Sequence, residues 1–281
     1  MARVCSIAVV APANRLQPDA AARVTVLADQ LYGGRARLIF HPQCFLSCGH
    51  FAGDDVARSA AFLEVANNPD IDAVWFARGG YGSCRVDDAV FAELNASAHA
   101  KTYIGYSDMG FLLARLNREA IGKQAHGPMP SDINREGGEA AVARALSWLV
   151  DRDGASLEPA CAPRGRVFAF NLTTLSNILG TRAEPDFTGA EIMIEDVDEH
   201  HYRIDRMMFH VTSSDAVRAS AGLRLGRMSK IPENDPPFER SVEEIVHYWC
   251  ARRGIAFLGL ADIGHDSGNK VVPFPALARV A

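Results

Sequence analysis

The chain has 281 residues, 48% of them hydrophobic, and a formal net charge of −5. This length is enough for a sizeable core and predicts two domains. The charge is modest and spread along the chain without a basic run, which argues against a nucleic-acid partner. No apolar stretch approaches membrane-spanning length, so we expect no membrane partner. Six cysteines without a CxxC motif predict a reduced, cytoplasmic protein rather than a disulfide-stapled one.

The N-terminal half alternates between apolar runs of strand length and segments of helical spacing. The predicted strands cover residues 4–10, 36–40, 71–77 and 102–106. Helical patterns lie between them, over residues 18–32, 54–67 and 87–94. The first run ends in a turn, which favours a strand over a signal peptide. The alternation predicts an α/β fold with a parallel sheet, whose functional groups collect beyond the carboxyl ends of the strands.

Two loops that follow predicted strands carry residues suited to chemistry. Residues 78–83 contain three glycines in four positions, which permits backbone N–H groups to converge on an anion. The spacing matches neither a Walker motif nor GxGxxG, so an oxyanion hole and a plain tight turn both stay open. The second loop places Ser107 where a strand turns into a helix, as in a nucleophile elbow. The alternative is that Ser107 or Asp108 only caps the helix.

Residues 151–165 are the best linker candidate, because they contain two glycines and two prolines with little periodicity. The chain before the linker, residues 1–150, is predicted to be one domain. The chain after it, residues 166–281, combines short strands and helices and predicts a smaller α/β domain. The expected strands of this second domain cover residues 190–194, 223–227, 255–261 and 271–274.

One combination of polar residues would support nucleophilic catalysis. Ser107, Glu195 and His265 each lie close after a predicted strand. Serine is a poor nucleophile unless a histidine takes its proton and a carboxylate holds the imidazole tautomer. A Ser-His-Glu triad assembled from both domains is therefore one interpretation. The alternative is that Glu195 belongs to a solvated acidic face and His265 to a loop in which its hydrogen bonds are satisfied.

Other histidines and cysteines give weaker signals. Residues 121–125 lead into a turn that begins at His126, and we interpret His126 as a hydrogen-bonded residue that stabilises this turn rather than as a ligand or base. Four potential metal ligands lie within ten residues of one another in the sequence. Spacing of this kind is weakly specific for a metal, and we predict no metal site. These four residues are His41, Cys44, Cys48 and His50.

Six motifs in a fixed order closely resemble those of the LD-carboxypeptidase family, which includes the microcin C self-immunity peptidases. They are ARGGYGS (77–83), IGYSD (104–108), HGPM (126–129), NLTTLSNILGT (171–181), IEDVDEHHYRIDRM (194–207) and GH (264–265). The matching blocks cover most of the chain, and an ordered set of motifs is more specific than any one of them.

This resemblance implies a serine peptidase with an N-terminal Rossmann-like domain and a C-terminal domain of swivelling β/α type. By motif, the nucleophile falls on Ser107, the carboxylate on Glu195 and the base on His265, with backbone N–H groups of Gly80 and Asp108 as oxyanion donors. The implied reaction removes the terminal D-alanine of muropeptide tetrapeptides in cell-wall recycling. No metal or organic cofactor is implied, and family members are commonly cytoplasmic homodimers.

The substrate is less firmly implied than the catalytic residues. The family usually has Gly-Gly where this chain has Ala169 and Phe170, and we expect Phe170 to narrow the pocket. Arg78 or Arg203, each beside motif residues, would bind the terminal carboxylate of a peptide. A relative that cleaves aminoacyl nucleotides is the second interpretation, with Phe170 or the aromatics near Trp249 as candidates for contact with a base. A non-catalytic α/β protein that binds an anion in the glycine loop is the third.

Overall fold

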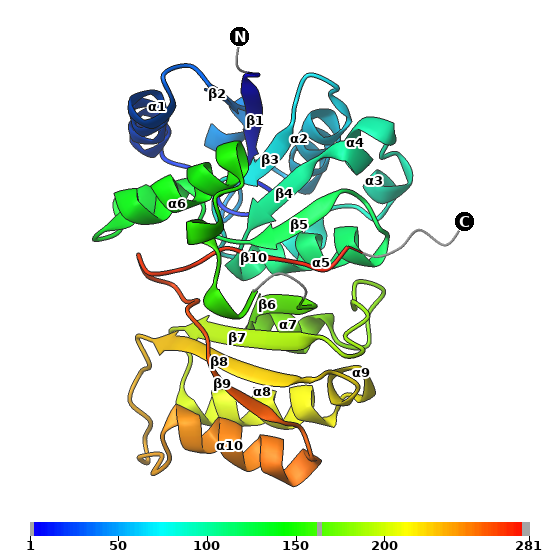
Figure 1. The fold of residues 1–281 in the computed structure, drawn as a ribbon, viewed down its shortest axis with the longest axis vertical. Coiled ribbons are helices and arrows are strands. Elements are labelled where there is room, and N and C mark those ends of the chain that lie inside the picture. Colours follow the sequence, from blue (N-terminus) through cyan, green and yellow to red (C-terminus); the bar gives the residue numbers. More distant parts are fainter. Residues whose placement is uncertain (1–2, 162–164, 277–281) are drawn as a thin grey trace.

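The computed structural model describes residues 3–161 and 165–276, which form two sheets, one above the other in Figure 1. The first sheet has the strand order β10-β5-β4-β3-β1-β2, and the second β6-β7-β8-β9. All pairs are parallel except β10 with β5. The strands are β1 (Cys5–Val10), β2 (Ala36–Phe40), β3 (Ala73–Phe76), β4 (Thr102–Gly105), β5 (Lys123–His126), β6 (Val167–Asn171), β7 (Glu191–Val197), β8 (Gly222–Ser229), β9 (Phe257–Leu260) and β10 (Val272–Pro273). This arrangement confirms the predicted fold class.

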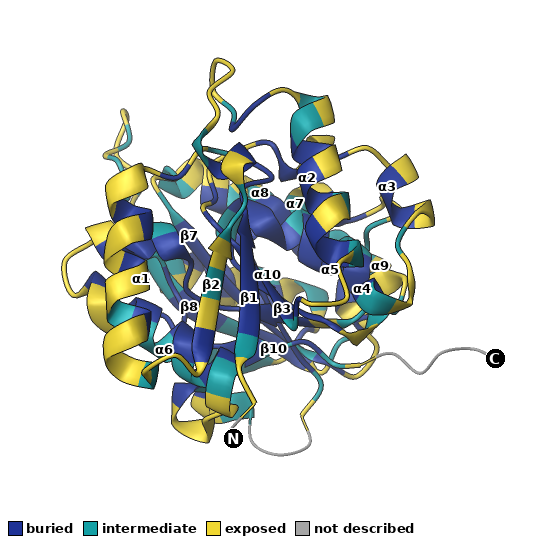
Figure 2. Ribbon diagram, turned by 90° about the horizontal axis from the view of Figure 1, so that it is seen from above, coloured by how far each residue is buried: buried dark blue, intermediate teal, exposed yellow. Residues whose placement is uncertain are grey.

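Helices cover both faces of the first sheet, as an all-apolar strand requires. Ile7 and Val9 of β1 pack toward α1 and α6, whereas Ala8 and Val10 point to the face covered by α2 and α5. Figure 2 shows these buried strands between partly exposed helices. The helices are α1 (Pro18–Tyr32), α2 (Asp55–Asn67), α3 (Ala89–Ala92), α4 (Ala96–Ala100), α5 (Gly110–Arg118), α6 (Gly138–Asp151), α7 (Leu172–Ile178), α8 (His201–Ser213), α9 (Asp215–Arg218) and α10 (Val242–Arg253).

The core of the second sheet is continuous with that of the first. Phe168 and Phe170 of β6 are fully buried in the same apolar cluster as α2, α5, α7, α8 and α10. Phe274, just after β10, packs against both phenylalanines, with ring centroids 5.1 and 5.2 Å away. The two sheets are therefore fixed to each other by apolar packing. No helix in the described ranges combines the length and apolarity needed to cross a membrane.

The last predicted strand does not join the second sheet. β10 instead pairs with β5 in the first sheet, with Val272 opposite His126. The chain thus crosses from β9 back to the N-terminal half, so the C-terminal stretch contributes to both sheets (Figure 1). The predicted linker, residues 151–165, begins with the last residue of α6 and contains two short 3₁₀ turns, and part of it lies outside the described residues.

Candidate active site

Ser107 lies at a sharp turn between β4 and α5. Its backbone is left-handed, with φ of 60°, a conformation that costs a non-glycine residue about 1–3 kcal/mol. A short 3₁₀ turn, Ser107–Met109, follows and leads directly into α5. The strand, the strained residue and the helix start together form an elbow that exposes the serine hydroxyl. The predicted elbow is therefore present, and Ser107 is not an ordinary helix cap.

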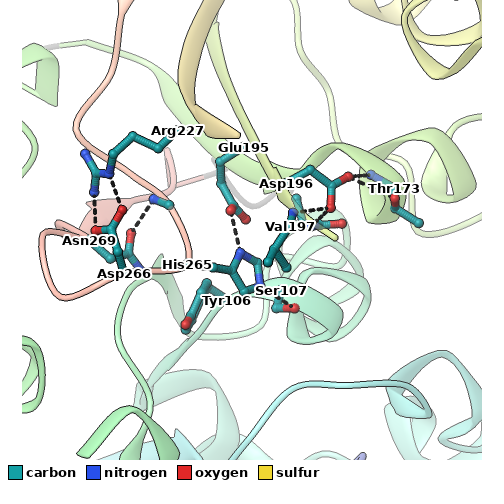
Figure 3. Close-up of polar contacts among 12 residues, drawn as sticks. Tyr106, Ser107, Thr173, Glu195, Asp196, Val197, Arg227, His265, Asp266 and Asn269 are labelled. Atoms are coloured by element: carbon teal, nitrogen blue, oxygen red, sulfur yellow. Dashed lines mark hydrogen bonds and ion pairs between the residues drawn. The ribbon is translucent and has the colours of Figure 1, made fainter. Parts of the chain in front are cut away.

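Ser107, His265 and Glu195 are joined by hydrogen bonds, as Figure 3 shows. The Oγ of Ser107 lies 3.0 Å from Nε2 of His265, and Nδ1 of His265 lies 2.6 Å from Oε2 of Glu195. The Glu195 side chain is fully buried and the His265 side chain is 6% exposed. Burial disfavours the charged imidazolium, but the Glu195 carboxylate outweighs this effect and raises the pKa of His265 above its usual value.

The position of Glu195 differs from the prediction, whereas His265 lies in a loop beyond a strand, as predicted. Glu195 lies inside β7, opposite Asn171 of β6, and not in a loop after the strand. The adjacent Asp196 is also buried, so these two carboxylates do not belong to a solvated face. His265 lies in the segment that connects β9 to β10, between the two sheets. The three side chains thus come from the first sheet, the second sheet and the connection between them.

The glycine loop lies directly against the elbow. A Cβ atom built on Gly79 would be 3.1 Å from Cβ of Ser107, and Gly80 has φ of 107°. Two hydrogen bonds from Ser83 tie the loop to the elbow. The Ser83 N–H donates to the Asp108 carboxylate at 2.8 Å, and the Ser83 hydroxyl donates to the Asp108 carbonyl at 2.5 Å. Burial raises the pKa of Asp108, while hydrogen bonds from the Ser83 backbone and side chain oppose the shift. Asp108 therefore has its side chain committed to the loop, and only its backbone is a candidate oxyanion donor.

A cleft of about 800 Å³ opens above Ser107 and His265 and is lined by both halves of the chain. Arg78 and Arg135 line it from the first half, and Asp198 and Glu199 from the second. Arg203, the other candidate for a substrate carboxylate, is half-exposed, pairs with Glu199 at 3.5 Å and is not one of the lining residues. Of the two predicted arginines, only Arg78 reaches the cleft.

Phe170 does not narrow this cleft. It is fully buried and packs among aromatic residues of the core. Its ring lies 3.2 Å from a Cβ built on Gly110, beneath the start of α5. Trp249 is partly buried in α10 and donates its indole N–H to Asp205 at 2.9 Å. Neither residue lines the cleft above Ser107, so the expected narrowing of the pocket by Phe170 is wrong.

His126 is buried, and its Nε2 lies 3.0 Å from Oδ1 of Asn269. Burial lowers the pKa of His126 to about 4, so it is neutral. This role resembles the predicted one, but the partner is distant in sequence. Within residues 3–161 and 165–276, no group of three or more His, Cys, Asp or Glu side chains is arranged to hold a metal ion. Nε2 of His41 lies 3.4 Å from Oε2 of Glu64.

Two sequence profiles of known protein domains match most of the chain. The sequence profile of the LD-carboxypeptidase N-terminal domain matches residues 7–127, and that of the C-terminal domain matches residues 164–280. The chain belongs to the LD-carboxypeptidase family. It is 25% identical to the murein tetrapeptide carboxypeptidase of Pseudomonas aeruginosa, in an alignment that covers 95% of this chain and 90% of that protein.

Solved structures share the fold of this chain. The muramoyltetrapeptide carboxypeptidase from Oxalobacter formigenes superposes with a TM-score of 0.79 at 25% identity, covering 95% of this chain and 92% of that one. The complex of MccF with glutamyl sulfamoyl guanosine gives a TM-score of 0.77 at 18% identity, covering 98% and 92%. The second likeness is one of fold alone.

Several cleft residues of this LD-carboxypeptidase family member escaped the sequence analysis. The Asp196 carboxylate accepts hydrogen bonds from the Asn171 amide at 2.7 Å and from the Thr173 N–H and hydroxyl, both at 2.9 Å. Arg135 bonds to the carbonyl of His265 and pairs with Asp132 at 3.0 Å. Asp196 lies near the end of β7, and Arg135 comes after β5 in the chain. Functional groups collect beyond the carboxyl ends of parallel strands, so these positions could have marked both residues as candidates.

Proposed function

We propose that the protein is a serine LD-carboxypeptidase that releases the terminal D-alanine of murein tetrapeptides. The observation that carries this proposal is the hydrogen-bond chain from Ser107 through His265 to Glu195, at the floor of a cleft. These hydrogen bonds run in the direction that acyl transfer needs, because Nε2 of His265 can accept the serine proton while Nδ1–H donates to a buried carboxylate.

The reaction would proceed in two stages. The Oγ of Ser107 attacks the carbonyl carbon of the scissile bond, and its proton moves to Nε2 of His265. Backbone N–H groups of Gly80 and Asp108 stabilise the oxyanion of the tetrahedral intermediate. His265 then gives the proton to the nitrogen of the departing D-alanine, leaving an acyl-enzyme. Water, deprotonated by the same histidine, hydrolyses the ester and restores Ser107.

Arg78 is the residue proposed to bind the terminal carboxylate of the substrate. It lines the cleft beside the glycine loop, and its guanidinium makes one long hydrogen bond, 3.5 Å, to the carbonyl of Arg15. No carboxylate among residues 3–161 and 165–276 pairs with Arg78, so its guanidinium keeps two N–H groups available for a bidentate bond. A carboxylate held there would orient the last residue of a peptide with its amide toward Ser107.

The experiment is an assay of free D-alanine from a murein tetrapeptide with purified protein. Wild type should release D-alanine, the Ser107→Ala variant should not, and the diastereomer ending in L-alanine should be a poor substrate. A chelator should leave the rate unchanged, since each proposed step uses side chains and backbone of this chain. Equal D-alanine release by Ser107→Ala would overturn the proposal. Cleavage of an aminoacyl nucleotide but not of the tetrapeptide would instead favour the second substrate class.

The recycling role, the cytoplasmic location and the homodimer follow from the family resemblance and stay predictions. Sedimentation equilibrium across a range of protein concentrations tests the dimer. Fractionation of cells that make the protein from its own gene tests the location.

A further inference from the structure

The base of the candidate triad lies in a segment without regular secondary structure. Residues 261–271 connect β9 of the second sheet to β10 of the first, and His265 is in the middle. A side chain on such a segment is only as well placed as the contacts that hold the segment. The question is therefore which groups fix the backbone on either side of His265.

Arg227 of β8 bridges both sides of the histidine, as Figure 3 shows in part. Its Nη1 donates to Oδ1 of Asp262 at 2.5 Å, three residues before His265. Its Nη2 donates to Oδ1 of Asp266 at 2.8 Å, and its Nε bonds to the other oxygen of the same carboxylate. One guanidinium thus makes a bidentate bond and a third bond across the turn that carries the base.

Glycines let the turn fold closely around this arginine. A Cβ built on Gly264 would be 3.0 Å from Cβ of Arg227, and one built on Gly268 would be 3.1 Å from its Nη2. Any side chain at either position would crowd Arg227. The turn is therefore shaped to fit the arginine on the second sheet, and the sequence GHDSG reflects that fit.

The first sheet holds the same turn from the other side. Asn269 Oδ1 accepts the Gly264 N–H at 3.2 Å and lies 3.0 Å from Nε2 of His126. Because a backbone N–H only donates, the acceptor is the amide oxygen, and His126 must carry its proton on Nε2. Arg144 of α6 also donates to the carbonyls of Ser267 and Asn269, at 2.9 and 2.8 Å.

We infer that Arg227 is a positioning residue for the base, which holds the His265 turn against the second sheet so that the imidazole meets Glu195 and Ser107 together. This inference rests on the proposed function. The Arg227 side chain is 35% exposed, so solvent partly screens its ion pairs and limits what they contribute to the free energy of unfolding. Its bonds span the turn, so its effect falls on the geometry of His265 and not mainly on global stability.

The test compares Arg227→Met and Arg227→Lys with a matched control on the same strand. Arg224 of β8 makes a similar ion pair with Glu191 at 2.6 Å and also bonds to the carbonyl of Leu258, away from the base. Arg227→Met should lower kcat for D-alanine release by about 100-fold, the scale expected for a displacement of about 1 Å. KM should change only a few-fold. Arg227→Lys should be intermediate, because a lysine has no fork, and Arg224→Met should stay near wild type.

A pH profile separates geometry from a change in charge. The charged and titratable groups that face His265 are Glu195, Asp196, Tyr106, His126, Asp132 and Arg135. If Arg227 acts by positioning, the 100-fold loss persists on the alkaline plateau, where His265 is neutral in every variant. A deficit that disappears on this plateau, or a deficit no larger than that of Arg224→Met, overturns the inference.

A second readout keeps the inference separate from the identity of the substrate. A fluorophosphonate reacts with an activated serine regardless of the natural substrate, and intact mass gives the labelling rate, with Ser107→Ala as the blank. Slow labelling of Arg227→Met, together with wild-type melting temperature, supports positioning even if the tetrapeptide is not cleaved. Wild-type labelling rates for Arg227→Met overturn it, even if the tetrapeptide is a good substrate.

Discussion

Glu195→Gln is the most informative single change, because it removes a charge while keeping the shape of the side chain. The Glu195 side chain is fully buried in β7, and its Oε2 lies 2.6 Å from Nδ1 of His265. This carboxylate counters the effect of burial and raises the pKa of His265. It also fixes which ring nitrogen carries the proton in the neutral state, so that Nε2 faces Ser107 as an acceptor.

The expected loss follows from these two roles. Neutralising the carboxylate of a serine-protease triad lowers kcat by about 10⁴-fold, which corresponds to about 5 kcal/mol of transition-state stabilisation. Without the negative charge, burial dominates, and the pKa of His265 should fall. The rate rises with pH through this pKa, because only the neutral imidazole accepts the serine proton. The acid limb of the variant's pH–rate profile should therefore lie at lower pH than that of wild type. The plateau value of kcat above this limb should be much lower than that of wild type.

The assay is steady-state D-alanine release by wild type and variant over a wide pH range. Asp196→Asn is the matched control, since Asp196 is the next buried carboxylate on β7 but bonds to Asn171 and Thr173 instead of His265. We expect the control to keep kcat within about tenfold, because it removes no direct partner of the base. Turnover of Glu195→Gln within tenfold of wild type, with an unmoved acid limb, would refute the assignment of Glu195.

Three further predictions follow from the cleft. Gly80→Ala should lower kcat by about 10²–10³-fold, because φ of 107° disfavours a side chain and a new Cβ would lie 2.4 Å from Nδ2 of Asn14. The control Gly34→Ala, at a glycine with φ of 87° in open space, should keep the wild-type kcat. If both variants turn over at equal rates, the glycine loop is only a plain turn. Arg78→Met should raise KM by about 10–100-fold and Arg203→Met should not, and the reverse result would contradict the carboxylate assignment. The acid limb of kcat/KM for wild type should lie above the usual pKa of histidine, because Glu195 raises the pKa of His265; a limb below it would argue against this pairing in solution.

Local patterns were sufficient to predict most of the first sheet and its elbow. The apolar run of β4, followed by helical spacing, placed Ser107 correctly because both signals are short-range. The end of β7 could not be predicted in the same way. Glu195 and Asp196 are charged, so the apolar pattern stops before them, yet the strand continues to Val197. Partners that are distant in sequence, His265 for one and Asn171 for the other, stabilise these carboxylates inside the sheet.

The wrong predictions concern residues whose role depends on where the side chain points in the folded structure. Phe170 was expected in the pocket, but the alternation along β6 points it into the core against Phe274. Arg203 neighbours motif residues in sequence, yet its place in the first turn of α8 pairs it with Glu199. Nothing local distinguishes β10 from a strand of the second sheet, since its partner β5 lies about 150 residues earlier. These predictions failed because the contacts that decide them join residues far apart in the sequence, and local patterns do not report such contacts.

If the proposed triad is the catalytic one, its placement ties activity to the relation between the two sheets. Ser107 follows β4 of the first sheet and Glu195 belongs to β7 of the second, so a shift of one sheet would separate them. His265 contacts both at once, and its segment is bonded to both sheets, by Arg227 on one side and by Asn269 with His126 on the other. The continuous core and the return of β10 to the first sheet remove much of the freedom that a two-domain chain would otherwise have. A base carried on the crossing segment is therefore held where both of its partners can be reached without a domain movement.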